Sequence, residues 1–139
     1  MGGAIPKNVV AAMLAAEVAG LTTPKLGLYT SGITPLPTTP LSAFTAPTGT
    51  WYAAATPTFG RPFENPDGSV SMQIIVGQFN YTGASASETV NGWYLWDDGV
   101  SPKLLVAAGA LPTPVTMAGL LDSVLPDARM TIPSIPQTP

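Results

Sequence analysis

Residues 88–99, ETVNGWYLWDDG, hold the densest run of aromatic side chains in the chain and end in two adjacent aspartates. A β-strand places successive side chains on opposite faces, so Trp93 and Leu95 would point one way and Tyr94 and Trp96 the other. The pattern therefore predicts a strand with two apolar faces. One face can enter the core, and the other can meet a facing sheet, a subunit or a ligand.

A turn and a second apolar run follow this strand. Asp98 and Gly99 form a pair of the kind that hairpins use where φ must be positive. Residues 101–111, SPKLLVAAGAL, come directly after the pair. This order predicts a β-hairpin that turns at residues 97–101.

Short runs with a period of two continue outward from the hairpin. The clearest is SVSMQIIVGQFNYTG, residues 69–83, and the preceding ENPDGS, residues 64–69, is typical of a turn. Residues 33–44, ITPLPTTPLSAF, carry three prolines and predict an extended loop. Further strands are expected over residues 25–32, 49–59 and 128–132.

Residues 5–20 predict the one helix of the chain. Pro6 suits the first turn, alanine and leucine favour helix, and Gly20 is well placed as the C-terminal stop. Val10 and Leu14 belong to a set of side chains spaced by three and four residues, so one side of the helix can pack on a sheet or on a neighbouring subunit.

Together these features predict an all-β fold in a single domain, residues 1–139. We expect a β-sandwich or jelly roll of about seven to eight strands over residues 22–132, with one N-terminal α-helix over residues 5–20. An extended Pro-rich C-terminal tail is expected over residues 133–139, PSIPQTP, either free or laid over a neighbour.

The composition excludes several functional classes. Charged residues make up 9% of the chain, the net charge is −3, and there is no cysteine or histidine. The five basic residues are scattered, which disfavours nucleic-acid binding. Thiol nucleophiles, histidine-based catalytic arrangements and zinc sites with thiolate or imidazole ligands are absent from the sequence. No cofactor and no metal are expected.

The sparse charge also bears on association. A free monomer usually remains soluble because its surface is charged, whereas this chain has few charges and sixteen prolines. Such a surface is explained if neighbours in an assembly cover much of it, and we expect a homo-oligomer. A surface that is wet but uncharged, rich in threonine and serine, is the alternative.

The only candidate targeting segment is VVAAMLAAEVAG, residues 9–20. Its apolar run of about eight residues is short for a secretory signal and far below the ~20 residues of a membrane span. No membrane partner is expected.

The adjacent Asp97 and Asp98 are the strongest candidates for catalysis, because paired carboxylates hydrolyse glycosides. That chemistry needs two carboxyl groups facing each other across a cleft, at about 5–9.5 Å, whereas neighbours on a turn point apart. ENPDG and DDG also contain fragments of a calcium loop, but neither is complete. We therefore interpret the pair as a structural turn, and no catalytic residue is expected.

The aromatic side chains have two possible roles. They can form the core and a subunit interface, or they can form a sugar-stacking platform, which would need coplanar exposed rings. We favour the first role, in which the helix and the tail also act as clasps. The candidate interface residues are Trp51, Tyr52, Trp93, Tyr94, Trp96, Val10, Leu14, Ile132 and Ile135.

The layout of the sequence resembles small virion structural proteins of tailed bacteriophages. The resemblance rests on a helix followed by LGLYTSGITPLPTTPLSAFTAPTGTWY, residues 26–52, then FNYTGASASETVNGWYLWDDG, residues 79–99, and a closing segment over residues 104–132. Such proteins usually carry an acidic residue before the aromatic of the proline-containing loop, and here Ala43 precedes Phe44. The resemblance implies a virion location and a role in capsid decoration (a cement protein) or as a minor tail component.

From the composition and the resemblance together, we expect a non-enzymatic protein that stabilises a phage head through subunit contacts. Its partners would be other virion proteins, the major capsid protein among them, and further copies of itself. The alternative is a receptor- or glycan-binding module on a virion tail or cell surface that uses Trp51, Trp93 or Trp96. A hydrolase that uses acidic residues is the third possibility.

Overall fold

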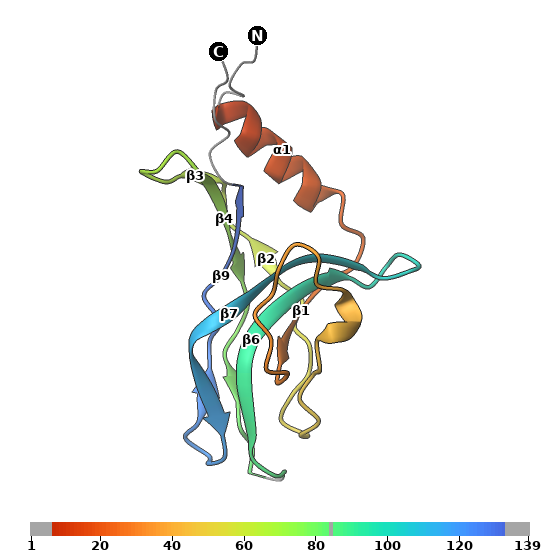
Figure 1. Ribbon diagram of the computed structural model, residues 1–139, viewed down its shortest axis with the longest axis vertical. Coiled ribbons are helices and arrows are strands. Elements are labelled where there is room, and N and C mark those ends of the chain that lie inside the picture. The colour runs from red at the N-terminus through yellow and green to blue at the C-terminus, as the bar shows by residue number, and fades with distance from the viewer. Residues whose placement is uncertain (1–6, 84, 133–139) are drawn as a thin grey trace. The chain divides into compact units, whose positions relative to one another are not determined.

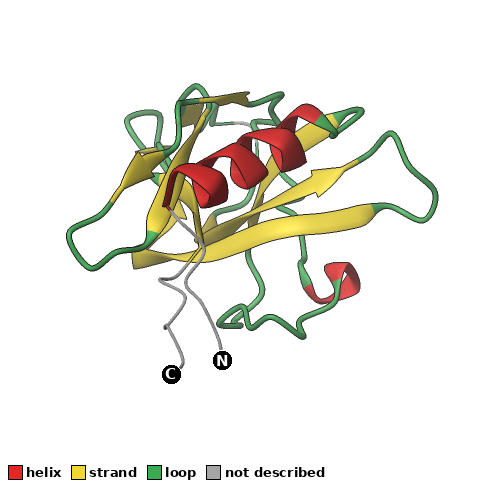
Figure 2. Ribbon diagram, turned by 90° about the horizontal axis from the view of Figure 1, so that it is seen from above, coloured by secondary structure: helices red, strands yellow, loops and turns green. Residues whose placement is uncertain are grey.

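The computed structural model describes residues 7–83 and 85–132, and this part of the chain consists mainly of strands and loops, with one α-helix and a single short 3-10 turn (Figure 2). The elements in chain order are α1 (Lys7–Ala19), β1 (Pro24–Tyr29), η1 (Leu41–Ala43), β2 (Thr58–Phe59), β3 (Phe63–Glu64), β4 (Val70–Ile75), β5 (Phe79–Asn80), β6 (Glu88–Asp97), β7 (Leu104–Met117), β8 (Ser123–Val124) and β9 (Ala128–Ile132) (Figure 1). The β-rich class with one helix agrees with the sequence prediction. The expected tail, residues 133–139, lies outside the described residues.

Two compact units can be distinguished along the chain. The helix unit combines residues 7–21, 58–75 and 127–132 of the described part, and the hairpin unit combines residues 22–57 and 76–126. Each unit is therefore assembled from segments that are distant in sequence.

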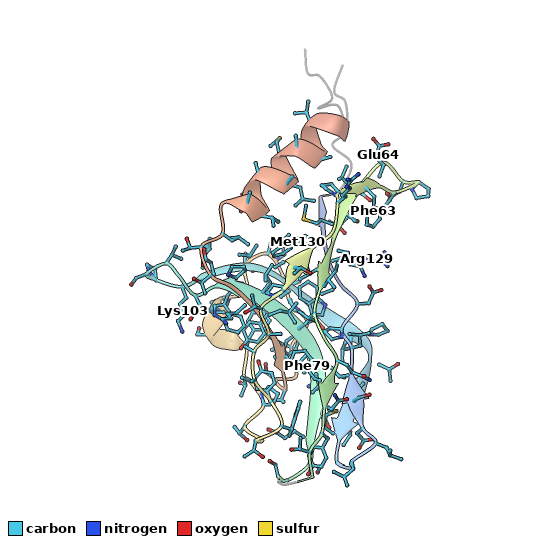
Figure 3. The ribbon with its side chains drawn as sticks, turned by 180° about the vertical axis from the view of Figure 1, so that it is seen from behind. Phe63, Glu64, Phe79, Lys103, Arg129 and Met130 are labelled. Carbon is cyan, nitrogen blue, oxygen red and sulfur yellow. The ribbon has the colours of Figure 1, made fainter. Side chains whose placement is uncertain are left out.

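The sheet of the helix unit is built around β4. Strands β2 and β3 pair with two different stretches of β4, and β9 pairs with β4 over residues 70–74. All three pairings are antiparallel. Met130 of β9 lies opposite Met72, and both are buried. Arg129 and Met130 project on opposite sides of β9, as the period of two requires (Figure 3).

Helix α1 contacts β4 in the same unit. Val10 and Leu14, one helical turn apart, are buried, while Met13 and Glu17 are exposed. The helix ends as predicted near Gly20, whose N–H donates to the carbonyl oxygens of Ala16 and Glu17. The buried stripe of α1 is thus narrower than the sequence spacing indicates.

The sheet of the hairpin unit has the order β1–β6–β7, with β6 in the middle. Strands β6 and β7 form the long hairpin predicted from the sequence, and Figure 2 shows both strands converging on their connecting loop at the right. On the other edge of β6, Tyr29 lies opposite Gly92 and Leu26 opposite Leu95. A separate two-stranded sheet, β5–β8, belongs to the same unit.

Strand β7 continues through Pro112 and Pro114, whereas the sequence analysis predicted that this strand ends before the two prolines. Val90 pairs with Val115 and Gly92 with Ala110, so residues 111–114, including Pro112 and Pro114, form a bulge opposite one residue of β6. A bulge on an edge strand is where prolines are tolerated, because they donate no ladder hydrogen bond there.

Two of the predicted strands differ from the expectation: residues 49–59 are mostly loop, and residues 69–83 form two separate strands. Of residues 49–59, Thr58 and Phe59 are in β2, and Ala55 makes an isolated bridge to Leu26. The predicted strand over residues 69–83 is interrupted at residues 76–78, where the chain passes from the helix unit to the hairpin unit. Period-two alternation alone does not reveal such a crossing.

Candidate functional site

The turn of the β6–β7 hairpin places its two aspartates in different environments. Asp97 is 2% exposed, and its carboxylate accepts hydrogen bonds from the backbone N–H groups of Thr22 at 3.0 Å, Thr23 at 2.8 Å and Gly99 at 3.0 Å. These three hydrogen bonds lower the pKa of Asp97 below its ordinary value. Asp97 therefore acts as a clasp that ties the end of β6 to the segment before β1.

Gly99 is required by this clasp for a reason other than the expected one. Within the described residues, only Gly68 and Gly83 have positive φ, so the prediction of a positive-φ turn at Asp98–Gly99 is wrong. A Cβ atom at residue 99 would lie 2.8 Å from side-chain atoms of Thr22 and Thr23. The glycine permits a close approach of two chain segments.

Asp98 faces solvent and forms an ion pair. Its carboxylate lies 2.9 Å from Lys103 Nζ and 3.4 Å from the donor Nε1 of Trp96. The hydrogen bond from Lys103, followed by that from Trp96, lowers the pKa of Asp98. The two carboxylates thus bind different partners within the chain, an arrangement that does not match the facing pair of a glycosidase.

The face of β6 that carries Tyr94 and Trp96 is covered by the chain itself. The Tyr94 and Trp96 rings stack with centroids 4.7 Å apart, and Phe44, which follows η1, stacks on Tyr94 at 4.9 Å. Tyr29 meets Phe44 edge to face at 5.2 Å. Ile33 and Leu41 of the proline-containing loop pack against this cluster. The loop expected to be merely extended therefore forms the cover of an aromatic core.

A second aromatic group continues from the first. The Tyr52 and Phe79 rings stack at 6.0 Å, and Trp51 lies between Tyr52 and Tyr81 at 5.8 and 6.5 Å. Burial, followed by the neighbouring Tyr94, raises the pKa of Tyr52 to about 12. Burial also raises the pKa of Tyr94. These aromatic side chains serve mainly as packing partners of one another.

Three glycines in the hairpin unit make room for aromatic rings on neighbouring strands. Gly109 lies opposite Trp93, and a Cβ there would lie 2.7 Å from the indole Nε1. Gly27 lies beneath the rings of Tyr52 and Trp96, and Gly92 beneath Tyr29. Aromatic rings over strand glycines pin the register of a sheet.

Other carboxylates also hold loops. Glu88 accepts hydrogen bonds from the backbone N–H groups of Thr48 at 2.8 Å and Gly49 at 3.0 Å. Burial alone would raise the pKa of Glu88, but these hydrogen bonds outweigh it and lower the pKa. Trp51 Nε1 is buried without a partner of acceptable hydrogen-bond geometry, although it lies close enough to Glu88 to add to the lowering.

The sequence fragments that resemble a calcium loop, ENPDG and DDG, are also turns in which a carboxylate accepts hydrogen bonds from the chain itself. In the turn at residues 64–69, Asp67 accepts hydrogen bonds from Ser69, at 2.9 Å from its N–H and 2.6 Å from its hydroxyl, and Gly68 has φ of 89°. Phe63 and Glu64 lie on the neighbouring β3 (Figure 3). Across residues 7–83 and 85–132, no three acidic side chains converge as a metal site would require.

The loop between β7 and β8 exposes aliphatic side chains that the sequence analysis did not single out. Leu120 is 74% and Leu121 99% exposed, and Leu125, just after β8, is 63% exposed. Asp122 holds the loop, because its carboxylate accepts from the N–H groups of Ala118 at 2.9 Å and Gly119 at 2.7 Å. The signal in the sequence was GLLDSVL, residues 119–125, in which adjacent leucines precede an aspartate.

The predicted interface residues are placed as follows. Trp51, Trp93, Tyr94, Val10 and Leu14 are buried, and Tyr52 and Trp96 are half-buried. Ile132 is the last residue of β9, and Ile135 lies outside the described residues. As an interface, this set stays a prediction, and the largest exposed apolar side chains of the described part are different ones.

No protein-family model, no curated protein and no solved structure matches this chain. In the part of the chain that the structure describes, α1 is too short to cross a membrane.

Proposed function

We propose that this protein is a non-enzymatic structural protein of a bacteriophage virion that decorates the head and stabilises it through subunit contacts. Its fold would be the β-sandwich or jelly roll expected from the sequence. The virion setting comes from the resemblance of the sequence to small phage structural proteins. The role in assembly is supported by the surface of the chain.

The segment over residues 118–125, which comprises the exposed β7–β8 loop, β8 and Leu125, is the observation that carries the proposal. Its leucines lie in solvent, yet its backbone is held by the Asp122 carboxylate and by the hydrogen bond from the Tyr81 N–H to the Asp122 carbonyl oxygen at 3.0 Å. A preordered apolar loop loses little conformational entropy when a partner covers it. It is therefore suited to binding a complementary apolar depression on a capsid.

The energetic contribution of this loop is modest for one copy and large for a lattice. Complete burial of one leucine side chain contributes about 1.5–3 kcal/mol. Many copies bound at symmetry-related positions combine such contributions, because each additional contact is made at high effective concentration. A small protein with weak individual contacts can thus stabilise a shell.

The chemistry of the hairpin turn supports a structural role in preference to catalysis. Asp97 binds backbone N–H groups, and Asp98 binds Lys103. Of the three tryptophans that a glycan-binding module would use, Trp96 stacks on Tyr94, and Trp51 and Trp93 are buried. These contacts support the scaffold interpretation of residues 88–99.

Binding to particles tests the proposal. Purified heads that lack the protein are mixed with it, and bound protein is measured by co-sedimentation. We expect saturable binding and a higher temperature of DNA release from decorated heads. Leu121→Ser should weaken binding about tenfold or more, because it removes a leucine side chain that becomes buried when the protein binds the head. Leu36→Ser removes an equally aliphatic side chain, 63% exposed, from a different loop and should leave binding unchanged.

Two results would contradict this function. Heads that never bind the wild-type protein would exclude a decoration role. A shift of tryptophan fluorescence on addition of a glycan panel, without binding to heads, would instead indicate a receptor- or glycan-binding module.

A further inference from the structure

Among the described residues, no strand pairs with the outer edge of β7. Strand β7 is at the end of the β1–β6–β7 sheet, and its ladder hydrogen bonds are made with β6. Among the described residues, no hydrogen bond from outside that ladder reaches the backbone of residues 104–117. Unpaired N–H and C=O groups along a strand are a template for another strand.

The N-terminal half of this edge has few of the features that normally protect one. Residues 104–110, LLVAAGA, contain no charge and no proline, whereas the C-terminal half is interrupted by the proline bulge. The extra residue at Val106, between the pairs Trp96–Leu105 and Leu95–Ala107, bends the strand but adds no charge. Residues 104–110 span about 24 Å when extended.

We propose that residues 104–110 pair antiparallel with the same residues of a second copy of this chain, about a two-fold axis at Ala107. This register is self-complementary in size. It places Leu104 opposite Ala110, Leu105 opposite Gly109 and Val106 opposite Ala108 of the partner. Each large side chain thus meets a small one, and the bulged Val106 meets an alanine.

Charge also selects this arrangement. Lys103 is the charged residue that flanks the segment, and antiparallel pairing separates the two copies of Lys103 by about 27 Å along the strands. Parallel pairing in register would instead place the two lysines side by side, where like charges destabilise a sheet and only the ion pair of each lysine with Asp98 would offset the repulsion. It would also place the leucines opposite each other and glycine opposite glycine.

The uniform small side chains favour a second copy over a different partner. Strand addition usually obtains its specificity from pockets for alternate side chains, and residues 107–110 are alanine and glycine. The C-terminal residues 133–139 are a poor donor strand, because three of the seven are prolines without an N–H. The inference is independent of the proposed function, since it is tested on the purified protein without particles.

Single-cysteine scanning tests the register, because the chain contains no cysteine of its own. Cysteine is placed at each position from 105 to 110 in separate variants, with Thr116→Cys and Ala53→Cys, both at exposed residues, as controls. A two-fold antiparallel pair brings one residue next to its own copy, within the distance that a disulfide spans. We expect one variant, Ala107→Cys, to form dimers under mild oxidation about tenfold faster than the controls.

A charge pair at two exposed positions provides the second test. Leu104→Lys combined with Ala110→Lys should abolish dimers in sedimentation equilibrium, whereas Leu104→Lys combined with Ala110→Glu should retain them, because opposite charges then face each other. Circular dichroism confirms that both variants fold. Equal cross-linking at every position, or a protein that remains monomeric at about 1 mM, would overturn the proposal.

Discussion

Tyr29 of β1 lies directly opposite Gly92 of β6, and its ring occupies the space into which a side chain at residue 92 would project. The same arrangement recurs where Trp93 lies opposite Gly109. In the central strand β6, Gly92 is thus covered by a ring from β1, and Trp93 places its own ring over Gly109 of β7. Register in this sheet is determined by these pairs as well as by backbone hydrogen bonds.

We expect Gly92→Ala to destabilise the protein by about 1–3 kcal/mol, because the added methyl group would overlap with the Tyr29 ring and with the carbonyl oxygen of Gly109. Gly32→Ala is the matched control, since a Cβ at residue 32 has no neighbour within 4 Å. Urea denaturation measures both free energies of unfolding. Equal stability of the two variants would show that Tyr29 does not need the glycine.

Acid should destabilise the protein through the Asp97 clasp. Hydrogen bonds from Thr22, Thr23 and Gly99 lower the pKa of Asp97 in the folded state. Its contribution to stability is therefore present above the unfolded pKa of about 3.9 and is lost as the pH falls through the lower, folded value. Asn accepts fewer hydrogen bonds, so Asp97→Asn should be less stable at neutral pH and should lose less stability on acidification.

Thermal unfolding from neutral pH down to about pH 2 checks this prediction. Glu17→Gln, at an exposed residue of α1, is the control and should follow the wild-type curve. An Asp97→Asn curve parallel to that of the wild type would show that the clasp does not contribute to acid sensitivity.

Alkaline pH should destabilise the protein through ionisation of the Tyr52 phenol. Burial, together with Tyr94, raises the pKa of Tyr52 to about 12, above the unfolded value of about 10. The associated stability is present below about pH 10 and is lost as the pH rises through about 12. Phenolate absorbance should therefore still rise near pH 12, and Tyr52→Phe should reduce the amplitude of that step by one phenol. Titration of all four tyrosines in one step near pH 10 would contradict the burial of Tyr52.

Asp122→Ala should loosen the leucine loop without removing a leucine. The N–H groups of Ala118 and Gly119 lose their acceptor, so their hydrogen exchange should become faster, while exchange in β6 stays unchanged. Binding to heads should weaken because the loop is no longer preordered. Unchanged exchange at both amides would show that the carboxylate does not hold the loop.

The sequence predicted those features that depend on local pattern. Alternation predicted the β6–β7 hairpin, the propensity and capping of residues 5–20 predicted α1, and ENPDGS predicted the turn before β4. Residues 128–132 were predicted as a strand with the bounds of β9. Each of these depends on side chains within a few residues of one another, so it can be read from the sequence.

The tertiary structure decided how the polar and aromatic side chains are used. Nothing in DDG shows that Asp97 binds the N–H groups of Thr22 and Thr23, because these residues are more than seventy positions away. The same holds for Phe44, which reaches the stacked rings of Tyr94 and Trp96 from a loop predicted to be only extended. Gly99 was correctly singled out, but its role is close packing against a distant segment and its φ is not positive.

What the sequence by itself determined is a β-rich chain with one helix, few charges and a two-faced strand at residues 88–97. What only the tertiary structure decided is that Phe44 and the proline-containing loop cover one face of this strand, and that no strand of the described residues pairs with the outer edge of β7. The physical reason is that period and propensity report on neighbours along the chain. Burial and strand pairing depend on contacts whose partners the local sequence does not specify.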